Sequence, residues 1–293
     1  MLIKLGTRRS KLALAQSGLV IAALKRVNPE IKVEVHEIVT TGDKLYDQDL
    51  ALIGGKGLFL KEIEDQLLDG KIDIAVHSMK DVPASLPEGL VIDCMLEREN
   101  VQDVFVSEKY NNLAELPEGA AVGTSSPRRR LQLLANRPDL KIISMRGNVN
   151  TRIDKLARGE YDAIVLAYAG IKRLGLDAHI KEVISTDVML PAVGQGAIGI
   201  ERNMHDEKLS ALFKEINHIP TSLCVEAERS FMQSLKGDCT TPLAAYAQIK
   251  GDYIHLKVGY AHAGANTMRF EQAQDTIANR FQLGHSLAQR FLL

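Results

Sequence analysis

Apolar and polar positions follow two different rhythms along the first third of the chain. Residues 2–6 and 72–76 are short apolar runs, which predict buried strands, and residues 32–39 alternate apolar with polar positions as a half-exposed strand does. Between them, residues 10–27 repeat apolar positions at helical spacing, with Ser10 placed to cap the helix N-terminus. Short strands that alternate with helices indicate βα units.

The same scheme recurs three times after residue 100. The segments "AAVGTSSPRRRLQLLANRP", "KIISMRGNVNTRIDKLARG" and "YDAIVLAYAGIKRLGL" each predict a strand, a tight turn and a helix. Ser126 fits the N-cap of the first of these helices, and Pro127 fits its first position, where the missing N–H costs nothing. Three such units in succession predict a mainly parallel sheet with helices on both faces.

A different pattern begins near residue 217. It predicts a helix, three strands with a hairpin turn at Gly251-Asp252, and a final helix from about Thr276. The first helix and the three strands are expected near 221–236, 243–249, 253–260 and 267–273. This block is α+β, in contrast to the βα repeats before it.

Composition and charge exclude several classes of protein. The 293 residues carry a net charge of −1, whereas a general nucleic-acid binder is usually basic, so we expect no nucleic-acid partner. No run of about 18 apolar residues predicts a membrane span, and the N-terminal stretch lacks the apolar core of a signal peptide. The cysteines lie far apart, without CxxC or zinc-type spacing, so we expect neither disulfides nor a metal site. Together these features favour a cytoplasmic protein.

Gly194, Gly196 and Gly199 have the GxGxxG spacing of a dinucleotide-binding loop. Such a loop follows a strand and opens a helix, but here Pro191 precedes the glycines and the residues after them alternate like a strand. We therefore expect a glycine-rich crossover between two domains at this position.

Polar side chains directly follow the strand at 72–76. In open α/β sheets, ligands bind just outside the C-terminal ends of strands, where His77, Ser78, Lys80 and Asp81 fall. A carboxylate beside a lysine ionises readily, so Asp81 could hold a cation or carry a proton. The alternative is that Lys80 and Asp81 form a solvated surface turn.

Arginines recur where strands are predicted to end. Arg128 and Arg129 lie at a helix N-terminus, which is itself an anion site. Arg8 and Arg146 follow strands, and Arg152 lies near the start of a helix. Because guanidinium groups bind carboxylates in a bidentate fork, we expect these arginines to converge on one carboxylate-binding cleft. Taken singly, each arginine is more typical of a surface position.

Cys239 differs in its surroundings from the other two cysteines. Cys94 and Cys224 lie in apolar contexts that predict buried core residues. Cys239 lies in the polar turn "GDCTT" between a predicted helix and a predicted strand. Its context leaves open whether this thiol is incidental or a point of attachment.

Seven motifs, in the same order along nearly the whole chain, resemble the hydroxymethylbilane synthase (porphobilinogen deaminase) family. They are "TRRSKLALAQ", "GGKGLFLKEIE", "AVHSMKDVP", "GTSSPRRR", "RGNVNTR", "YDAIVLAYAGIKRLG" and "LPAVGQGA". The similarity weakens in the third block and toward the C-terminus.

The resemblance implies an activity and a fold. Members of this family join four porphobilinogen molecules head to tail with release of ammonia, and hydrolysis then frees the linear tetrapyrrole. The implied fold is α/β with three domains. Two βα lobes, like those of periplasmic binding proteins, flank the active-site cleft, and a smaller α+β domain carries the cofactor cysteine. On this chain the domains would be 1–98 with 193–216, then 99–192, then 217–293. The family also suggests a monomer.

The resemblance further assigns roles to individual residues. Cys239 would hold a dipyrromethane cofactor through a permanent thioether, and Asp81 would be the catalytic carboxylate. The cofactor would also be contacted by Lys56, Ser78, Lys80, Asp81, Thr124, Ser125, Ser126, Arg128, Arg129 and Arg146. The substrate would be bound by Arg8, Ser10, Arg128, Arg146, Arg152 and Gln195. Each pyrrole carries two carboxylates, which explains a local need for many cations.

Two departures from the family pattern and two other functions remain open. Asp238 stands before Cys239, where the family commonly has glycine, and "ALIGGKG" lacks a lysine that some members carry before this motif. A non-catalytic, two-lobed carboxylate-binding protein would explain the βα repeats and the arginines without Asp81 or Cys239. An inactive homologue would bind pyrroles without turnover.

Overall fold

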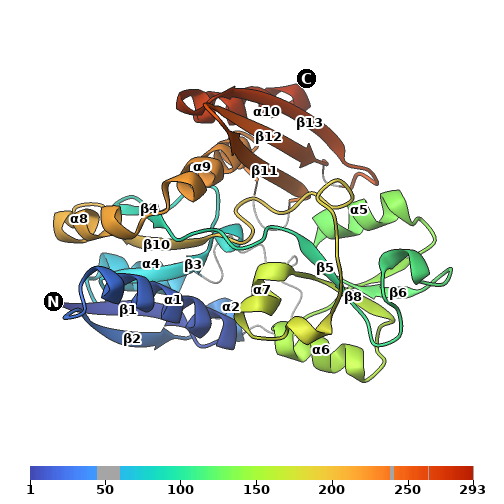
Figure 1. The fold of residues 1–293 in the computed structure, drawn as a ribbon, viewed down its shortest axis with the longest axis horizontal. Coiled ribbons are helices and arrows are strands. Elements are labelled where there is room, and N and C mark those ends of the chain that lie inside the picture. The colour runs from blue at the N-terminus through green and yellow to red at the C-terminus, as the bar shows by residue number, and fades with distance from the viewer. Residues whose placement is uncertain (45–59, 238–240, 263, 293) are drawn as a thin grey trace.

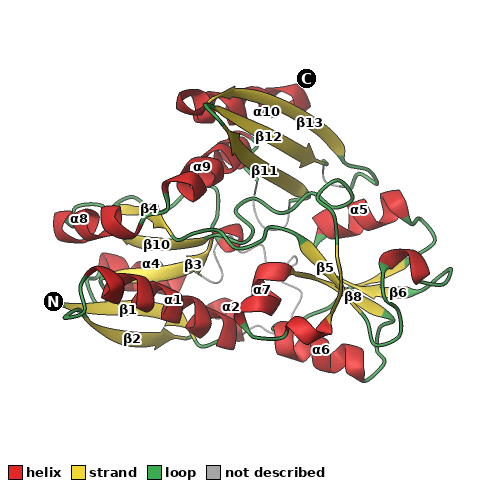
Figure 2. Ribbon diagram, viewed as in Figure 1, coloured by secondary structure: helices red, strands yellow, loops and turns green. Residues whose placement is uncertain are grey.

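Three sheets, each with its own helices, occupy separate parts of the molecule (Figures 1 and 2). The computed structural model describes residues 1–44, 60–237, 241–262 and 264–292. Strands before residue 96, together with the strand at 198–203, form the first sheet, and strands between 103 and 183 form the second. Strands after residue 242 form the third. The expected architecture of two α/β lobes and a smaller α+β domain is confirmed.

The first lobe is built on a five-stranded sheet in the order β2-β1-β3-β10-β4. Helix α1 packs on one face through Val20 and Leu24, and α4 packs on the other through Ile63 and Leu67. As predicted, Ser10 caps α1, since its Oγ accepts a hydrogen bond from Ala13 N at 3.2 Å. The elements are β1 (Leu2–Arg8), α1 (Lys11–Val27), β2 (Lys32–Ile38), α2 (Thr41–Lys44), α4 (Lys61–Leu68), β3 (Ile74–Ser78), η1 (Met79–Asp81), β4 (Leu90–Met95), β10 (Ile198–Asn203) and α8 (Glu207–Ile216).

The second lobe repeats this plan on a sheet in the order β7-β6-β8-β5-β9. Leu133 of α5 packs on one face, and Ile153 of α6 and Ile171 of α7 pack on the other. As predicted, Ser126 caps α5 and Pro127 is its first residue. The elements are β5 (Asp103–Val106), η2 (Leu113–Glu115), β6 (Ala121–Gly123), α5 (Pro127–Asn136), β7 (Lys141–Ile143), α6 (Val149–Ala157), β8 (Ala163–Ala167), α7 (Tyr168–Arg173), η3 (Asp177–His179) and β9 (Ile180–Val183).

The prediction of a mainly parallel sheet is wrong in part. In each lobe the sheet contains parallel pairs, β1 with β2 and β3, and β6 with β7 and β8. The strand that enters after a crossing between the lobes, β5 or β10, is antiparallel to both of its neighbours. Two crossings of the chain create these antiparallel strands, and local periodicity carries no information on where a crossing strand will insert.

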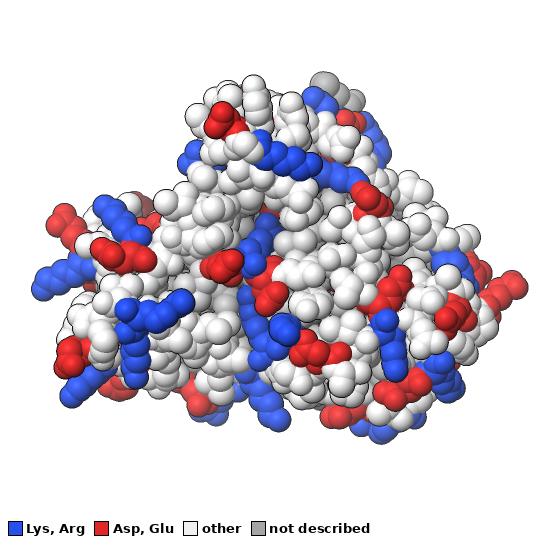
Figure 3. Space-filling view, viewed as in Figure 1, with Lys and Arg blue, Asp and Glu red and all other residues white. Residues whose placement is uncertain are grey.

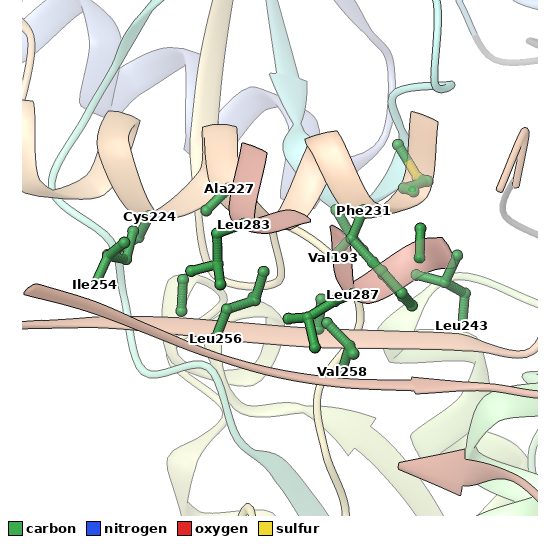
Figure 4. Close-up of a cluster of buried hydrophobic side chains, with 14 of the residues drawn as sticks. Val193, Cys224, Ala227, Phe231, Leu243, Ile254, Leu256, Val258, Leu283 and Leu287 are labelled. Atoms are coloured by element: carbon green, nitrogen blue, oxygen red, sulfur yellow. The ribbon is translucent and has the colours of Figure 1, made fainter. Parts of the chain in front are cut away.

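The third domain places two helices on one face of a three-stranded antiparallel sheet, β11-β12-β13. Its core lies between these layers, where Phe231 and Leu287 from the helices meet Leu256 and Val258 from the sheet (Figure 4). The final helix begins four residues later than predicted, because one turn of 3-10 helix precedes it. The elements are α9 (Ile219–Ser234), β11 (Leu243–Lys250), β12 (Tyr253–Tyr260), β13 (Arg269–Thr276), η4 (Ile277–Asn279) and α10 (Arg280–Leu292).

Glu228 of α9 joins the third domain to both crossing segments. Its carboxylate is fully buried and accepts hydrogen bonds from Arg98 Nη1 and Nη2 at 2.7 and 3.0 Å. Arg98 lies in the first crossing segment, and Gly194 in the second donates its N–H to the same carboxylate at 2.7 Å. Ala247 N of β11 adds a fourth bond at 2.9 Å. One side chain therefore fixes the third domain against the hinge between the lobes.

Candidate active site

The turn that follows β3 carries the polar residues on which function was expected. β3 ends at Ser78, and η1 contains Met79, Lys80 and Asp81. Met79 is buried, and its N–H donates to Ala197 O at 3.1 Å, which attaches the turn to the second crossing segment. Lys80 is half-buried and Asp81 is exposed. The turn thus presents an acid and a base at the C-terminal edge of the first sheet.

The glycines of "VGQGAIG" make room for this turn. A Cβ at Gly199 would lie 2.2 Å from Met79 Sδ, and one at Gly194 would lie 2.7 Å from Met79 Cβ. A Cβ at Gly196 would lie 2.3 Å from the carbonyl oxygen of Glu99, on the other crossing segment. The last of these glycines, Gly199, lies in a strand, β10, which begins at Ile198. The expectation of a crossover in place of a dinucleotide loop is therefore confirmed.

A cavity of about 260 Å³ lies where both lobes and the third domain meet. The first lobe contributes Lys80 and Asp81, and the second contributes Arg128, Arg129 and Arg152. The remaining lining residues are Val82, Ser125, Ser126, Ala192, Val193, Gln195, Met232, Thr241 and Leu243. Of the five arginines expected to converge, Arg128, Arg129 and Arg152 line this cavity, while Arg8 and Arg146 are not among its lining residues.

Asp103, which the sequence analysis missed, holds two of the arginines in place. Its buried carboxylate accepts from Arg128 Nη2 at 2.8 Å and from Arg129 Nη2 at 2.6 Å. Burial alone would raise the pKa of Asp103, but Arg128 and Arg129 hold it well below its usual range. The signal for Asp103 was an acid at the head of the apolar run "DVFV", because a buried acid requires cationic partners.

The described part of the cavity wall is rich in cations. Burial lowers the pKa of Lys80, while Asp81 opposes this shift and Arg129 adds to it. Among the described residues, Arg128, Arg129, Arg152 and Lys80 line the cavity together with the carboxylate of Asp81, and Asp103 binds Arg128 and Arg129 from behind. Since a guanidinium has five N–H groups, Arg128 and Arg129 retain donors beyond those that bind Asp103 and the carbonyls of Leu190 and Val165. A ligand with several carboxylates suits this wall.

Gln195 lines the same cavity, and its side-chain amide is fixed in orientation. Its Nε2 donates to Val101 O at 2.7 Å and to Asp103 Oδ1 at 3.0 Å, so the amide cannot flip without losing both bonds. Its Oε1 is buried and has no partner among the described residues. A buried acceptor without a partner is costly, and an N–H donor on a ligand would satisfy it. Pyrrole rings carry such an N–H.

Asp81 also lines a second, smaller cavity of about 70 Å³. Arg8, Ser10 and Ser78 lie there together with Gln16, which the sequence analysis missed and whose Nε2 donates to Ser78 Oγ at 2.7 Å. Gln16 is a buried amide on a helix face that also buries Ser17 among apolar side chains, and a polar residue on this face was its only signal in the sequence. Asp81 therefore lies between two adjoining spaces.

Arg8 is bound to Asp43 in this region. Its Nε donates to Asp43 Oδ1 at 3.2 Å, and Nη2 bonds to the same oxygen. Burial alone would raise the pKa of Asp43, but the hydrogen bonds and charge of Arg8 lower it. The expected role of Arg8 as a carboxylate ligand thus involves a side chain that already has an acidic partner.

The hydroxyl-bearing residues of the second lobe shape the cavity wall. Thr124 is buried and its Oγ1 accepts from Ser126 N, while Ser126 Oγ accepts from Arg129 N at 3.4 Å. Ser125 Oγ bonds to the backbone of residue 145. Arg146 is half-buried in the turn after β7. These contacts order the start of α5, from which Arg128 and Arg129 project.

Two predicted cofactor contacts, Lys56 and Cys239, lie outside the described residues. Thr241, two residues beyond Cys239, lines the larger cavity. Cys94 and Cys224 are buried, as expected, and burial raises the pKa of their thiols to about 12 and about 11. In the described ranges, no cluster of three or more His, Cys, Asp or Glu is arranged to hold a metal ion.

Figure 3 shows basic and acidic side chains interspersed over the face that it draws, in keeping with a net charge of −1. Among the described residues no helix is long and apolar enough to cross a membrane.

Comparisons with known proteins match both parts of the chain. Residues 3–211 match the family model of the porphobilinogen deaminase dipyromethane cofactor binding domain, and residues 222–292 match that of the porphobilinogen deaminase C-terminal domain. A porphobilinogen deaminase of Brevibacillus brevis is 52% identical over 246 residues, which cover 84% of this chain and 80% of the relative.

Solved structures of more distant proteins resemble the fold. The periplasmic VFT2 domain of BvgS from Bordetella pertussis has a TM-score of 0.45 at 14% identity and covers 73% of this chain and 86% of its own. The periplasmic aliphatic sulphonate binding protein of Escherichia coli has a TM-score of 0.43 at 16% identity, with 80% and 70% covered. On the family models and the 52% identical relative, the chain belongs to the porphobilinogen deaminase family.

Proposed function

We propose that Asp81 is the catalytic carboxylate of a cleft that joins porphobilinogen units on a dipyrromethane cofactor held by Cys239. One observation carries this assignment. Asp81 lines both cavities, and the larger one is walled by Lys80, Arg128, Arg129 and Arg152. A ligand in either space therefore meets the same carboxylate.

Family membership supplies the activity. The chain is a transferase of tetrapyrrole biosynthesis, a hydroxymethylbilane synthase, and it uses a dipyrromethane cofactor. When bound, this cofactor supplies the terminal pyrrole carbon to which the next unit is joined.

The residues present fit such a cofactor. The basic wall of the larger cavity suits its carboxylates, and Gln195 Oε1 offers an acceptor for a pyrrole N–H. Thr241, two residues beyond Cys239 in the chain, lines the same cavity. We assign cofactor contacts to Ser78, Lys80, Thr124, Ser125, Ser126, Arg128, Arg129 and Arg146, and to Lys56, which lies outside the described residues.

Other polar and cationic residues of the cleft are assigned to the carboxylates of the substrate. Arg152 lines the larger cavity, and Arg8 and Ser10 line the smaller one. We assign substrate binding to Arg8, Ser10, Arg128, Arg146, Arg152 and Gln195. Bidentate binding by guanidinium fixes orientation as well as charge, which a head-to-tail condensation requires.

Asp81 stabilises positive charge during each condensation. Loss of ammonia from porphobilinogen leaves a cationic electrophile, and the attacking ring carries positive charge until it loses a proton. A carboxylate held in a fixed position stabilises such charge with little reorganisation. The turn that carries Asp81 is held in place by Met79, which donates its N–H to Ala197 O and packs closely against Gly194 and Gly199.

The remaining assignments concern the whole chain. We infer domain boundaries at 1–98 with 193–216, at 99–192 and at 217–293, supported by the strand membership of the three sheets. We further infer a cytoplasmic monomer without a nucleic-acid partner, and the net charge of −1 supports the last of these inferences.

Intact mass under denaturing conditions tests the attachment. The protein should carry an excess equal to two linked pyrrole units, and Cys239→Ser should lose it. No excess in protein from a host that makes porphobilinogen would refute the thioether, and would favour a carboxylate-binding protein or an inactive homologue.

Steady-state kinetics test Asp81. Asp81→Asn should lower kcat for porphobilinogen consumption about 100-fold or more while the added mass remains, since charge stabilisation of this kind is worth roughly that factor. Asp187→Asn, at an exposed aspartate, is the matched control. An Asp81→Asn protein with normal kcat would remove Asp81 from the chemistry.

A further inference from the structure

A buried acid–imidazole pair holds the upstream side of the Asp81 turn. His77, immediately before Ser78, bonds through Nε2 to Glu201 Oε2 at 2.9 Å. His77 is 6% exposed and Glu201 is fully buried. The two side chains come from directly adjacent antiparallel strands, since Gly199 pairs with His77 and Glu201 pairs with Ala75. The pair therefore fixes where β3 ends and η1 begins.

An arginine of the third domain holds the downstream side. Arg229 of α9 donates through Nη2 to Pro83 O at 2.8 Å and through Nη1 to Val82 O at 3.3 Å. One turn later on α9, Gln233 Nε2 donates to Ala84 O at 2.9 Å. Side chains of α9 thus donate hydrogen bonds to the carbonyls of the three residues that follow Asp81, which are Val82, Pro83 and Ala84.

The two anchors are separate sets of contacts on the same turn. Arg229 binds the backbone after Asp81 directly, and it forms no hydrogen bond with Glu201 among the described residues. Burial lowers the pKa of Arg229 to about 10, and the negative charge of Glu201 partly offsets this shift. Glu201 Oε1 has no hydrogen-bond partner among the described residues, and neither does Oε1 of Glu64, which faces it from α4. A fully buried carboxylate with one direct partner needs such a cation nearby.

We propose that Glu201 and Arg229 are positioning residues for the reaction: Glu201 holds the upstream side of the Asp81 turn through His77, and Arg229 holds its downstream side through the carbonyls of Val82 and Pro83. Residues 78–81 form a short link between these two anchors. Because the transition-state charge must fall beside the Asp81 carboxylate, a loosened anchor moves that carboxylate without removing it. The role also couples the third domain, whose helix α9 leads toward the cofactor cysteine, to the acid of the first lobe.

The proposal rests on the assigned role of Asp81, and the variants are chosen to separate the two. Glu201→Gln keeps the shape and removes the charge, and Arg229→Met removes the grip on the carbonyls. Each should lower kcat about 10- to 100-fold with little change in KM, since displacement of a catalytic group by about 1 Å has this effect. Arg229→Lys keeps the charge but loses the paired N–H donors of the guanidinium, so its kcat should lie between that of Arg229→Met and that of wild type.

The double variant distinguishes a shared effect of the two residues on kcat from two independent effects. If Glu201 and Arg229 act through one brace, kcat of Glu201→Gln/Arg229→Met should equal that of the worse single variant, whereas independent effects would multiply. The control is Asp93→Asn, which breaks the Arg202–Asp93 pair on the neighbouring residue of β10. Cofactor content by intact mass normalises every rate to loaded enzyme.

The inference would be overturned by normal kcat in loaded Glu201→Gln and Arg229→Met, by a fully multiplicative double variant, or by an equal fall in kcat in Asp93→Asn. A rise in KM at constant kcat would also refute it, because it would indicate a binding role. If Asp81→Asn has normal kcat, the assignment of Asp81 is wrong, and this result is distinct from the results that refute the roles of Glu201 and Arg229.

Discussion

Replacing Glu64 by glutamine should make the stability of the protein less dependent on pH. Glu64 of α4 is 7% exposed and faces Glu201 and His77 on the sheet. Burial and, to a lesser degree, the charge of Glu201 raise the pKa of the Glu64 carboxyl to about 7, against the opposing effect of His77. At pH 6 the folded protein therefore keeps a proton that the unfolded chain has lost.

The sign and size follow from this difference. An unfolded glutamate has a pKa near 4.5, so the stabilisation is fully present below that pH and is lost as the pH rises to about 7. Each pKa unit corresponds to about 1.4 kcal/mol, so the total loss is about 3 kcal/mol. Between pH 5 and pH 8 the free energy of unfolding should fall by about 2.5 kcal/mol from this group alone.

Urea denaturation at several pH values measures this effect. The difference in unfolding free energy between Glu64→Gln and wild type should grow by about 2.5 kcal/mol from pH 5 to pH 8, because glutamine does not titrate. Glu30→Gln, at an exposed glutamate, should show a constant difference. A constant difference for Glu64→Gln as well, or a Glu64 carboxyl that titrates below about 5.5 by NMR, would refute the reasoning.

Two further variants probe the hinge and the turn. Glu228→Gln removes the charge that pairs with Arg98 and leaves the arginine buried without its partner charge. Urea denaturation should therefore show a free energy of unfolding lower by about 3–5 kcal/mol. A decrease below about 1 kcal/mol would contradict this. Gly199→Ala places a Cβ 2.2 Å from Met79 Sδ, so kcat should fall, whereas Gly18→Ala, which meets nothing within 4 Å in α1, should leave kcat unchanged and gain about 0.5–1 kcal/mol. Equal kcat in both alanine variants would show that Met79 adapts without moving Asp81.

Local signals in the sequence predicted the elements and much of the cleft. Ser10 and Ser126 cap their helices as expected, because N-caps depend on a few neighbouring residues. Lys80, Asp81 and Arg128 were placed at strand ends, and the C-terminal edges of parallel strands bring such residues together.

Long-range contacts could not be predicted in this way. Asp103 is 25 residues from Arg128 in the chain, and Glu201 is 124 residues from His77. These pairings depend on which strands become neighbours, and the crossing strands β5 and β10 insert antiparallel where periodicity gives no warning. The packing role of Gly199 against Met79 depends on the same crossing.

The place of β10 has a consequence for folding during synthesis. β10 lies between β3 and β4, although it follows them by about a hundred residues, whereas β5 to β9 of the second lobe are consecutive. In the described sheet β4 pairs only with β10, and β10 also covers one edge of β3. Until residue 203 has left the ribosome, the edges of β3 and β4 that β10 will cover therefore stay unpaired. We expect the second lobe to complete its sheet first, and the nascent first lobe to be the part that chaperones must protect from aggregation.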